Sequence, residues 1–126
     1  MHERSRHGKN AEEMVAYHLE EQGFTIIARN YRKRYGEIDL IARNKSLVAF
    51  VEVKMRNNDL VALGALVPRS KQKRIIAVAR EFIARNYELC SRSICRFDVA
   101  LVYQKEITYI PQAFTESERT SNGFSL

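Results

Sequence analysis

Three charged side chains stand in two segments that otherwise predict buried strands. The segments are "GEIDLIAR" (36–43) and "SLVAFVEVKM" (46–55), and they carry Asp39, Glu52 and Lys54. Because alternate side chains of a strand share a face, Glu52 and Lys54 point the same way. Asp39 joins them if the two strands pair as a hairpin. We therefore expect two carboxylates and an ammonium to gather at the end of one core face.

Two carboxylates in a partly desolvated place repel each other and lose hydration, a cost that proteins offset by pairing, protonation or a metal. Lys54 can offset one charge. Hard oxygen ligands from adjacent strands suit Mg²⁺ or Mn²⁺ better than zinc. Such an ion binds a phosphate oxygen and lowers the pKa of bound water, and Lys54 could orient or activate the attacking water. The alternative is a cross-strand charge ladder that performs no chemistry.

Composition favours one basic domain. The chain has 126 residues, 45% of them hydrophobic, which suits a single core. The 21 Lys and Arg residues outnumber the 15 Asp and Glu residues, and a net charge of +6 favours polyanionic partners, with nucleic acid as the leading candidate. No segment reads as a signal peptide or membrane span, so we expect a cytoplasmic protein without a membrane partner.

Periodicity predicts the order αβββαββ. Helices are expected at 9–22 and 71–87, the second capped by Ser70, and strands at 24–30, 36–43, 46–55, 93–103 and 105–110. The segment "YRKRY" (31–35) reads as a turn, and Ile38 and Leu40 should share one face of their strand. We expect a mobile loop at 56–69, one α/β domain at 1–114 and a flexible polar tail at 115–126.

The segment 46–55 is the longest and most apolar predicted strand, so it should be central. A helix connects it to "RFDVALV", which implies a parallel neighbour. The fold class is therefore α/β, a mixed sheet of about five strands flanked by helices.

An Asp followed on the next strand by Glu-x-Lys resembles the PD-(D/E)XK nuclease core, the restriction-endonuclease-like fold. With "GEIDLIA", "FVEVKMR" and "RFDVALV", the chain resembles the YraN family of predicted endonucleases, which are distantly similar to archaeal Holliday junction resolvases. The match extends over 8–110. It includes "GKNAE" (8–12) and three single residues, Asn30, Gly64 and Lys71. The proline of the PD signature is absent, because Ile38 precedes the aspartate.

The resemblance implies catalytic and metal-binding roles. Asp39 and Glu52 would bind Mg²⁺ or Mn²⁺ together with the Val53 carbonyl, and Lys54 would be the catalytic lysine. Glu12 would add the carboxylate that related resolvases bring from the first helix. The implied activity is metal-dependent hydrolysis of DNA, branched or single-stranded DNA included, by an enzyme that could be a homodimer.

Helical geometry separates Glu12 from Glu13. The apolar stripe of the first helix comprises Ala11, Met14, Val15 and Leu19. At about 100° per residue, Glu12 lies about 20° beyond Leu19, whereas Glu13 points nearly the opposite way. The Glu12 side chain can therefore point toward the sheet. In the alternative, both residues only favour the helix dipole at its N-terminal turn.

Basic residues flank the predicted loop and the start of the second helix. They are Arg56, Arg69, Lys71, Lys73 and Arg74. They could grip phosphates without reading sequence, or they could form a solvated basic face.

Three residue pairs have an interpretation of their own. Arg96 and Asp98 share a strand face and suggest a structural ion pair. Tyr31 and Tyr35 suit either base stacking or packing of the turn. Cys90 and Cys95 form an isolated C-x4-C pair, which reads as reduced thiols rather than as a zinc site.

The sequence leaves two functional interpretations open. One is a metal-dependent endonuclease acting on DNA. The other is a nucleic-acid-binding module with little or no turnover on a nuclease-like fold. Retention of both carboxylates and Lys54 favours the enzyme, because a binding module gains nothing from a repulsive carboxylate pair. A glycosidase with a carboxylate pair fits poorly, because so small and basic a domain offers little room for a sugar cleft.

Overall fold

The computed structural model describes residues 3–56 and 67–116. Its elements are α1 (Glu3–Glu21), β1 (Thr25–Lys33), β2 (Gly36–Asn44), β3 (Leu47–Met55), α3 (Arg69–Arg85), α4 (Tyr87–Cys90), β4 (Ile94–Tyr103) and β5 (Glu106–Phe114). Most of the predicted loop (57–66) and of the predicted tail (117–126) lies outside the described residues. The order of the long elements agrees with the sequence prediction. The short helix α4 was not predicted.

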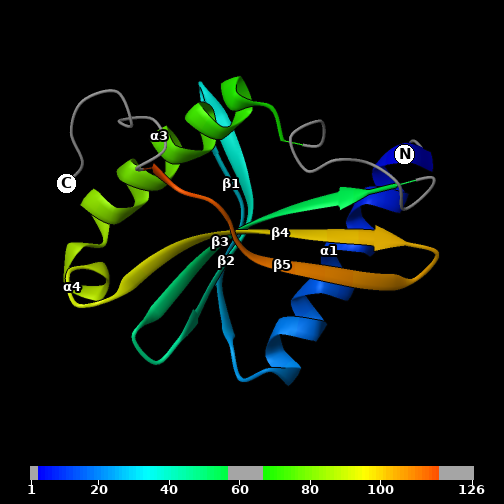
Figure 1. The fold of residues 1–126 in the computed structure, drawn as a ribbon, viewed down its shortest axis with the longest axis horizontal. Helices are drawn as coiled ribbons and strands as arrows, with labels where there is room; N and C mark the ends of the chain where they lie inside the picture. Colours follow the sequence, from blue (N-terminus) through cyan, green and yellow to red (C-terminus); the bar gives the residue numbers. More distant parts are fainter. Residues whose placement is uncertain (1–2, 57–66, 117–126) are drawn as a thin grey trace.

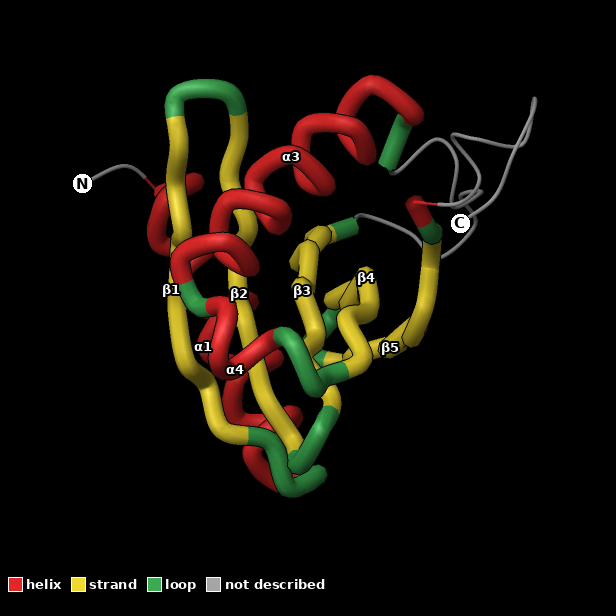
Figure 2. Tube along the Cα trace, turned by 90° about the vertical axis from the view of Figure 1, so that its left-hand side faces the viewer, coloured by secondary structure: helices red, strands yellow, loops and turns green. Residues whose placement is uncertain are grey.

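The five strands form one mixed sheet in the order β1-β2-β3-β4-β5. Neighbouring strands pair antiparallel except β3 and β4, which are parallel, as predicted from the helical connection. The helices α1 and α3 lie on opposite faces of the sheet (Figures 1 and 2). The strand order confirms the central position predicted for β3. The mixed sheet with helices on both faces confirms the predicted α/β class.

Two apolar clusters hold the helices against the sheet. On one face, Val15 and Leu19 of α1 pack with Leu40 and Val51. On the other face, the α3 cluster includes Val78, Phe82, Ile38, Ile41 and Phe50. Strand β3 contributes to both clusters, which explains why its sequence is an almost continuous apolar run. Glu52 interrupts that run as one of two buried charged residues among the described part of the chain.

Several predicted boundaries were wrong. Strand β1 continues through Lys33, so most of "YRKRY" is strand, and β5 continues past Pro111 to Phe114. Helix α3 begins at Arg69 with Pro68 as N-cap and no side-chain cap, so Ser70 is not the cap. The extended backbone of Pro68, with φ −61° and ψ 160°, already sets the helix start there.

The predicted alternation along β2 was also wrong in one place. Ile38 belongs to the α3-side cluster, whereas Leu40 belongs to the α1-side cluster. Asn30, with φ 50°, stands on β1 between the residues that pair with Leu40 and Ile38. Asn tolerates this left-handed backbone, so β1 departs from regular strand geometry beside this part of β2. Asp39 lies between Ile38 and Leu40, where the side chains of β2 change face.

Close packing fixes α3 over the start of β2. A Cβ atom on Gly36 would lie 3.2 Å from the Val78 side chain and 3.3 Å from the Arg74 carbonyl oxygen. Only glycine allows this approach without displacing the helix. The first turns of α3 are therefore held beside the tip of the β1–β2 hairpin. Among the described residues, no helix is long and apolar enough to cross a membrane.

Asp98 is the other buried charged residue, and it joins β4 to β5. The ion pair predicted with Arg96 is confirmed, with the Arg96 Nε atom 2.8 Å from the carboxylate. The carboxylate also accepts from the Tyr109 hydroxyl and from the Gln112 backbone N–H at 2.9 Å. Gln112 has φ 52° and lies near a register shift between β4 and β5. Asp98 thus satisfies a backbone donor at an irregular point of the ladder.

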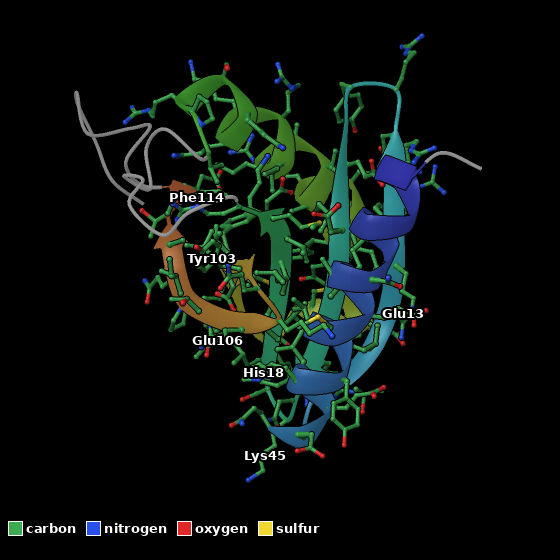
Figure 3. All side chains as sticks on the ribbon, turned by 90° about the vertical axis from the view of Figure 1, so that its right-hand side faces the viewer. Glu13, His18, Lys45, Tyr103, Glu106 and Phe114 are labelled. Atoms are coloured by element: carbon green, nitrogen blue, oxygen red, sulfur yellow. The ribbon has the colours of Figure 1, made fainter. Side chains whose placement is uncertain are left out.

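We expect Asp98→Ala to destabilise the fold by about 3–5 kcal/mol, because it leaves the Arg96 charge and two donors without their partner. Urea unfolding of both proteins measures this loss. Glu106→Ala is the control, because Glu106 is exposed on the same hairpin (Figure 3) and should change stability by less than about 0.5 kcal/mol. A loss below about 1 kcal/mol in Asp98→Ala would contradict the expected role of the network.

Candidate active site

The candidate site lies where β2 and β3 separate. Their ladder runs from Asn44↔Leu47 to Leu40↔Val51 and goes no further. Beyond it, the Val53 backbone N–H donates to Asp39 Oδ2 at 2.8 Å. The carboxyl group therefore takes the place of a ladder partner and is fixed between the strands. Because N–H and C=O of one strand residue point to the same side, the Val53 carbonyl also points toward β2.

Glu52 lies on β3 with only 7% of its side chain exposed. It follows Val48 and Phe50 along the face that packs against α3, as the two-residue period predicts. Its Oε2 atom lies 3.7 Å from Lys54 Nζ on the same strand and 2.6 Å from Lys71 Nζ on α3. One carboxylate oxygen thus contacts two ammonium groups.

Burial and repulsion change how these groups ionise. Burial first, and then the Glu52 charge, raise the pKa of Asp39 to about 8, although the Val53 N–H opposes the shift. Burial and the neighbouring Lys71 lower the pKa of Lys54. Burial disfavours the Lys71 ammonium as well, but the contacts with Glu52 and Lys54 outweigh it and raise the Lys71 pKa. Near neutral pH, Asp39 therefore keeps its proton in the absence of an added cation.

Glu12 reaches this site from α1. The Asn30 side-chain amide donates to Glu12 at 3.3 Å, and Glu12 and Asp39 lie close enough to influence each other's ionisation. Burial, followed by the charge of Glu37, raises the pKa of Glu12. Glu13 is exposed on the outer side of α1 (Figure 3). The predicted difference in orientation between Glu12 and Glu13 is confirmed.

We expect Glu12→Gln to weaken the binding of Mn²⁺ severalfold with little loss of stability, because it removes a charge beside Asp39 while the side chain keeps its shape. Isothermal titration calorimetry measures the affinity. Glu13→Gln is the matched control and should bind like the wild type. Equal affinities in the two variants would show that Glu12 serves only its helix.

The structure separates the predicted basic residues into two groups. Lys71 lies inside the site against Glu52. Arg69, Lys73 and Arg74 are exposed on the first turns of α3, and Arg56 follows β3 with its backbone N–H bonded to the Val102 carbonyl at 3.0 Å. Sequence reasoning placed Lys71 among the phosphate contacts, and only its long-range contact with β3 reveals its second environment. Asn30 was noted only as a motif match, and its contact with Glu12 likewise depends on how α1 packs.

The remaining candidates make contacts outside the carboxylate site. The Tyr31 ring packs edge-on against Phe82 with centroids 5.3 Å apart, and the Tyr35 hydroxyl donates to Glu81 at 2.8 Å. The Tyr31 contact agrees with packing of the hairpin, whereas the Tyr35 side chain is exposed. Cys90 and Cys95 are free thiols, and burial raises the pKa of both.

Comparison with known proteins identifies the family. Residues 11–102 match the family described as "Uncharacterised protein family UPF0102". The chain belongs to the UPF0102 family. The predicted YraN resemblance is confirmed, because UPF0102 is YraN-like. The matched range contains all the residues of the candidate site.

Individual UPF0102 proteins align along most of their length. The protein of Saccharophagus degradans is 40% identical over 112 residues, which cover 88% of this chain and 94% of the relative. The protein of Rhodopseudomonas palustris is 43% identical over 110 residues, covering 86% and 83%. The protein of Gloeobacter violaceus is 41% identical over 131 residues, covering 94% and 100%. The UPF0102 relatives are therefore about as long as this chain.

A solved structure shares the UPF0102 fold. It is Archaeoglobus fulgidus Hjc, described as a Holliday junction resolvase from an archaeal hyperthermophile. The TM-score is 0.55 at 21% sequence identity, over 79% of this chain and 72% of that chain. The restriction-endonuclease-like fold predicted for this UPF0102 chain is thereby confirmed.

Proposed function

We propose that this protein is a metal-dependent nuclease that hydrolyses phosphodiester bonds in DNA. The observation that carries the proposal is the meeting of Asp39, Glu52 and Lys54 where β2 and β3 separate, with Glu12 beside them. A purely structural site gains nothing from burying Asp39 beside a second carboxylate, and burial and that charge together raise its pKa to about 8. The nuclease-like fold supports this interpretation.

The donor set fits a hard divalent cation such as Mg²⁺ or Mn²⁺. Burial and the neighbouring Glu52 charge both favour the protonated form of Asp39, and a cation bound between the two carboxyl groups would offset both effects. Within residues 3–56 and 67–116, no group of three or more His, Cys, Asp or Glu side chains is arranged to hold a metal ion. The ligands that we assign are two carboxylates, Asp39 and Glu52, and the Val53 carbonyl, with Glu12 nearby. Mg²⁺ commonly keeps several waters beside one or two carboxylates.

When bound, the ion would supply Lewis acidity toward a phosphate oxygen and lower the pKa of a bound water. The chain's own groups do the rest. Lys54, beside Glu52, would orient the attacking water and stabilise the charge that develops on the phosphate. Arg56, Arg69, Lys71 and the exposed basic residues at the start of α3 would hold the DNA backbone.

The test compares three DNA forms. Linear duplex, single-stranded and four-way-junction DNA are incubated with the protein in Mg²⁺, in Mn²⁺ and in EDTA. We expect cleavage in the two metals and none in EDTA, with the junction as the first substrate to examine because the structural relative is described as a resolvase. Cleavage in EDTA, or cleavage by an Asp39→Asn variant purified in the same way, would identify a contaminating nuclease.

A second candidate function is a DNA-binding module without turnover. The contact of Lys71 with Glu52 favours it, because an ammonium at 2.6 Å already neutralises the carboxylate that a metal would need. This candidate predicts DNA binding that weakens with salt and is indifferent to Mg²⁺ and Mn²⁺. Binding of all three DNA forms without cleavage under any condition would favour it.

A further inference from the structure

Lys71 occupies an unusual position for a residue at the start of a basic helix. Its Nζ atom lies 2.6 Å from Glu52 Oε2, closer than the 3.7 Å of Lys54. The Glu52 side chain is 7% exposed, whereas 32% of the Lys71 side chain is exposed. Lys71 is therefore the more solvent-accessible partner of this ion pair.

Lys71 can leave Glu52 without any movement of the backbone. Helix α3 is anchored around it, because the Gln72 side chain donates to the Val67 carbonyl at 2.9 Å and Gly36 packs against Arg74 and Val78. The lysine stem is long and has four rotatable bonds, so rotation alone can carry its ammonium toward solvent. Lys54 differs from Lys71 in its attachment, because it stands two residues from Glu52 on the same strand rather than on a separate helix.

The position that the Lys71 ammonium would take after leaving Glu52 would also be favourable. Arg69, Lys73 and Arg74 are exposed on the same first turns of α3 as Lys71. A DNA phosphate bound there would offer Lys71 a second anionic partner. Without DNA, the repulsion among these cations favours the inward position against Glu52.

We propose that Lys71 is an exchangeable counter-ion, which neutralises Glu52 in the metal-free protein and passes to a DNA phosphate when a divalent cation takes its place. This inference rests on the proposed function. The ammonium and the ion compete for one carboxylate oxygen, so the ion binds weakly to the free protein. DNA removes the competitor and strengthens ion binding. By reciprocity, the ion strengthens DNA binding by the same factor.

The experiment titrates Ca²⁺, which takes oxygen ligands as Mg²⁺ does, into the protein in a calorimeter, with and without a saturating short DNA duplex. In the wild type we expect DNA to tighten Ca²⁺ binding by about 5- to 150-fold. In Lys71→Met, Ca²⁺ should bind tightly without DNA, and DNA should add less than about twofold. Lys71→Arg keeps the positive charge and should restore the weak binding and the response to DNA.

Lys73→Met controls for the general loss of a positive charge near the site. Lys73 is exposed two residues further along α3, so its loss should weaken DNA binding but keep the wild type's response of Ca²⁺ affinity to DNA. Melting temperatures without Ca²⁺ verify that every variant is folded.

The outcomes separate this inference from the proposed function. If Lys71→Met binds Ca²⁺ no more tightly than the wild type while Asp39→Asn binds none, the metal site stands and the exchange is overturned. If Lys73→Met tightens Ca²⁺ binding as much as Lys71→Met does, the effect is general electrostatics and the exchange is overturned as well. If neither the wild type nor any variant binds Ca²⁺, with or without DNA, the proposed metal-dependent function is wrong, and the exchange is wrong with it.

Discussion

Replacing Asp39 by Asn is expected to stabilise the metal-free protein and to abolish both its response to Mg²⁺ or Mn²⁺ and its cleavage of DNA. The folded protein raises the Asp39 pKa from 3.8 to about 8. The stabilisation that comes from the protonated carboxyl is therefore complete below about pH 4 and is lost as the pH rises through 8. Asn does not ionise, and its side-chain oxygen can still accept the Val53 N–H.

The expected gain is about 2–4 kcal/mol at pH 8.5 and shrinks toward zero near pH 4. Thermal melts of the wild type and Asp39→Asn in EDTA, at pH 5 and pH 8.5, measure it. In a second series, Mg²⁺ or Mn²⁺ should raise the melting temperature of the wild type but not of Asp39→Asn, because the ion binds the folded carboxylates. Glu13→Gln, with an exposed side chain, is the matched control. Equal ion-induced shifts in the wild type and Asp39→Asn would place the ion elsewhere.

Replacing Lys54 by Met is expected to lower the rate of DNA cleavage by about 100-fold or more while ion binding persists or tightens. Burial and the neighbouring Lys71 already lower the pKa of Lys54, which suits a group that acts on a proton or on developing charge. Met keeps most of the apolar stem and removes only the ammonium. Both carboxylates remain, so the affinity for Mn²⁺ should not fall.

Single-turnover cleavage with the protein in excess separates the chemical step from DNA binding. Lys45→Met is the control, because Lys45 is exposed at the turn between β2 and β3, at the far end of these strands from the site (Figure 3). It should cleave at the wild-type rate. Cleavage by Lys54→Met within about twofold of the wild type would remove Lys54 from the mechanism.

Local periodicity was sufficient to predict strand β3 and the face on which its charged side chains lie. A strand alternates its side chains through covalent geometry alone, so Glu52 and Lys54 had to follow Val48 and Phe50 on one face. The same reasoning separated Glu12 from Glu13, because the helical period is equally local. The long apolar run also required a central strand buried on both faces, and the topology has one.

Contacts between distant segments could not be predicted from local periodicity. Asp39 bonds to the Val53 N–H fourteen residues away, and Asn30 bonds to Glu12 across eighteen. Neither contact follows from a strict two-residue period, which also places Ile38 and Leu40 on one face although they belong to opposite clusters. Lys71 reads as a phosphate contact in the sequence, and only the packing of α3 against Gly36 brings it beside Glu52.

The sequence by itself therefore determined which strand and helix faces carry the charges, because the position of a side chain on its own element follows from the repeat of that element. The tertiary structure decided which charges touch. Distances between elements depend on how a helix docks on a twisted sheet and on where two strands separate. The sequence of one element alone specifies neither. The proton on Asp39 and the ammonium against Glu52 are consequences of that docking.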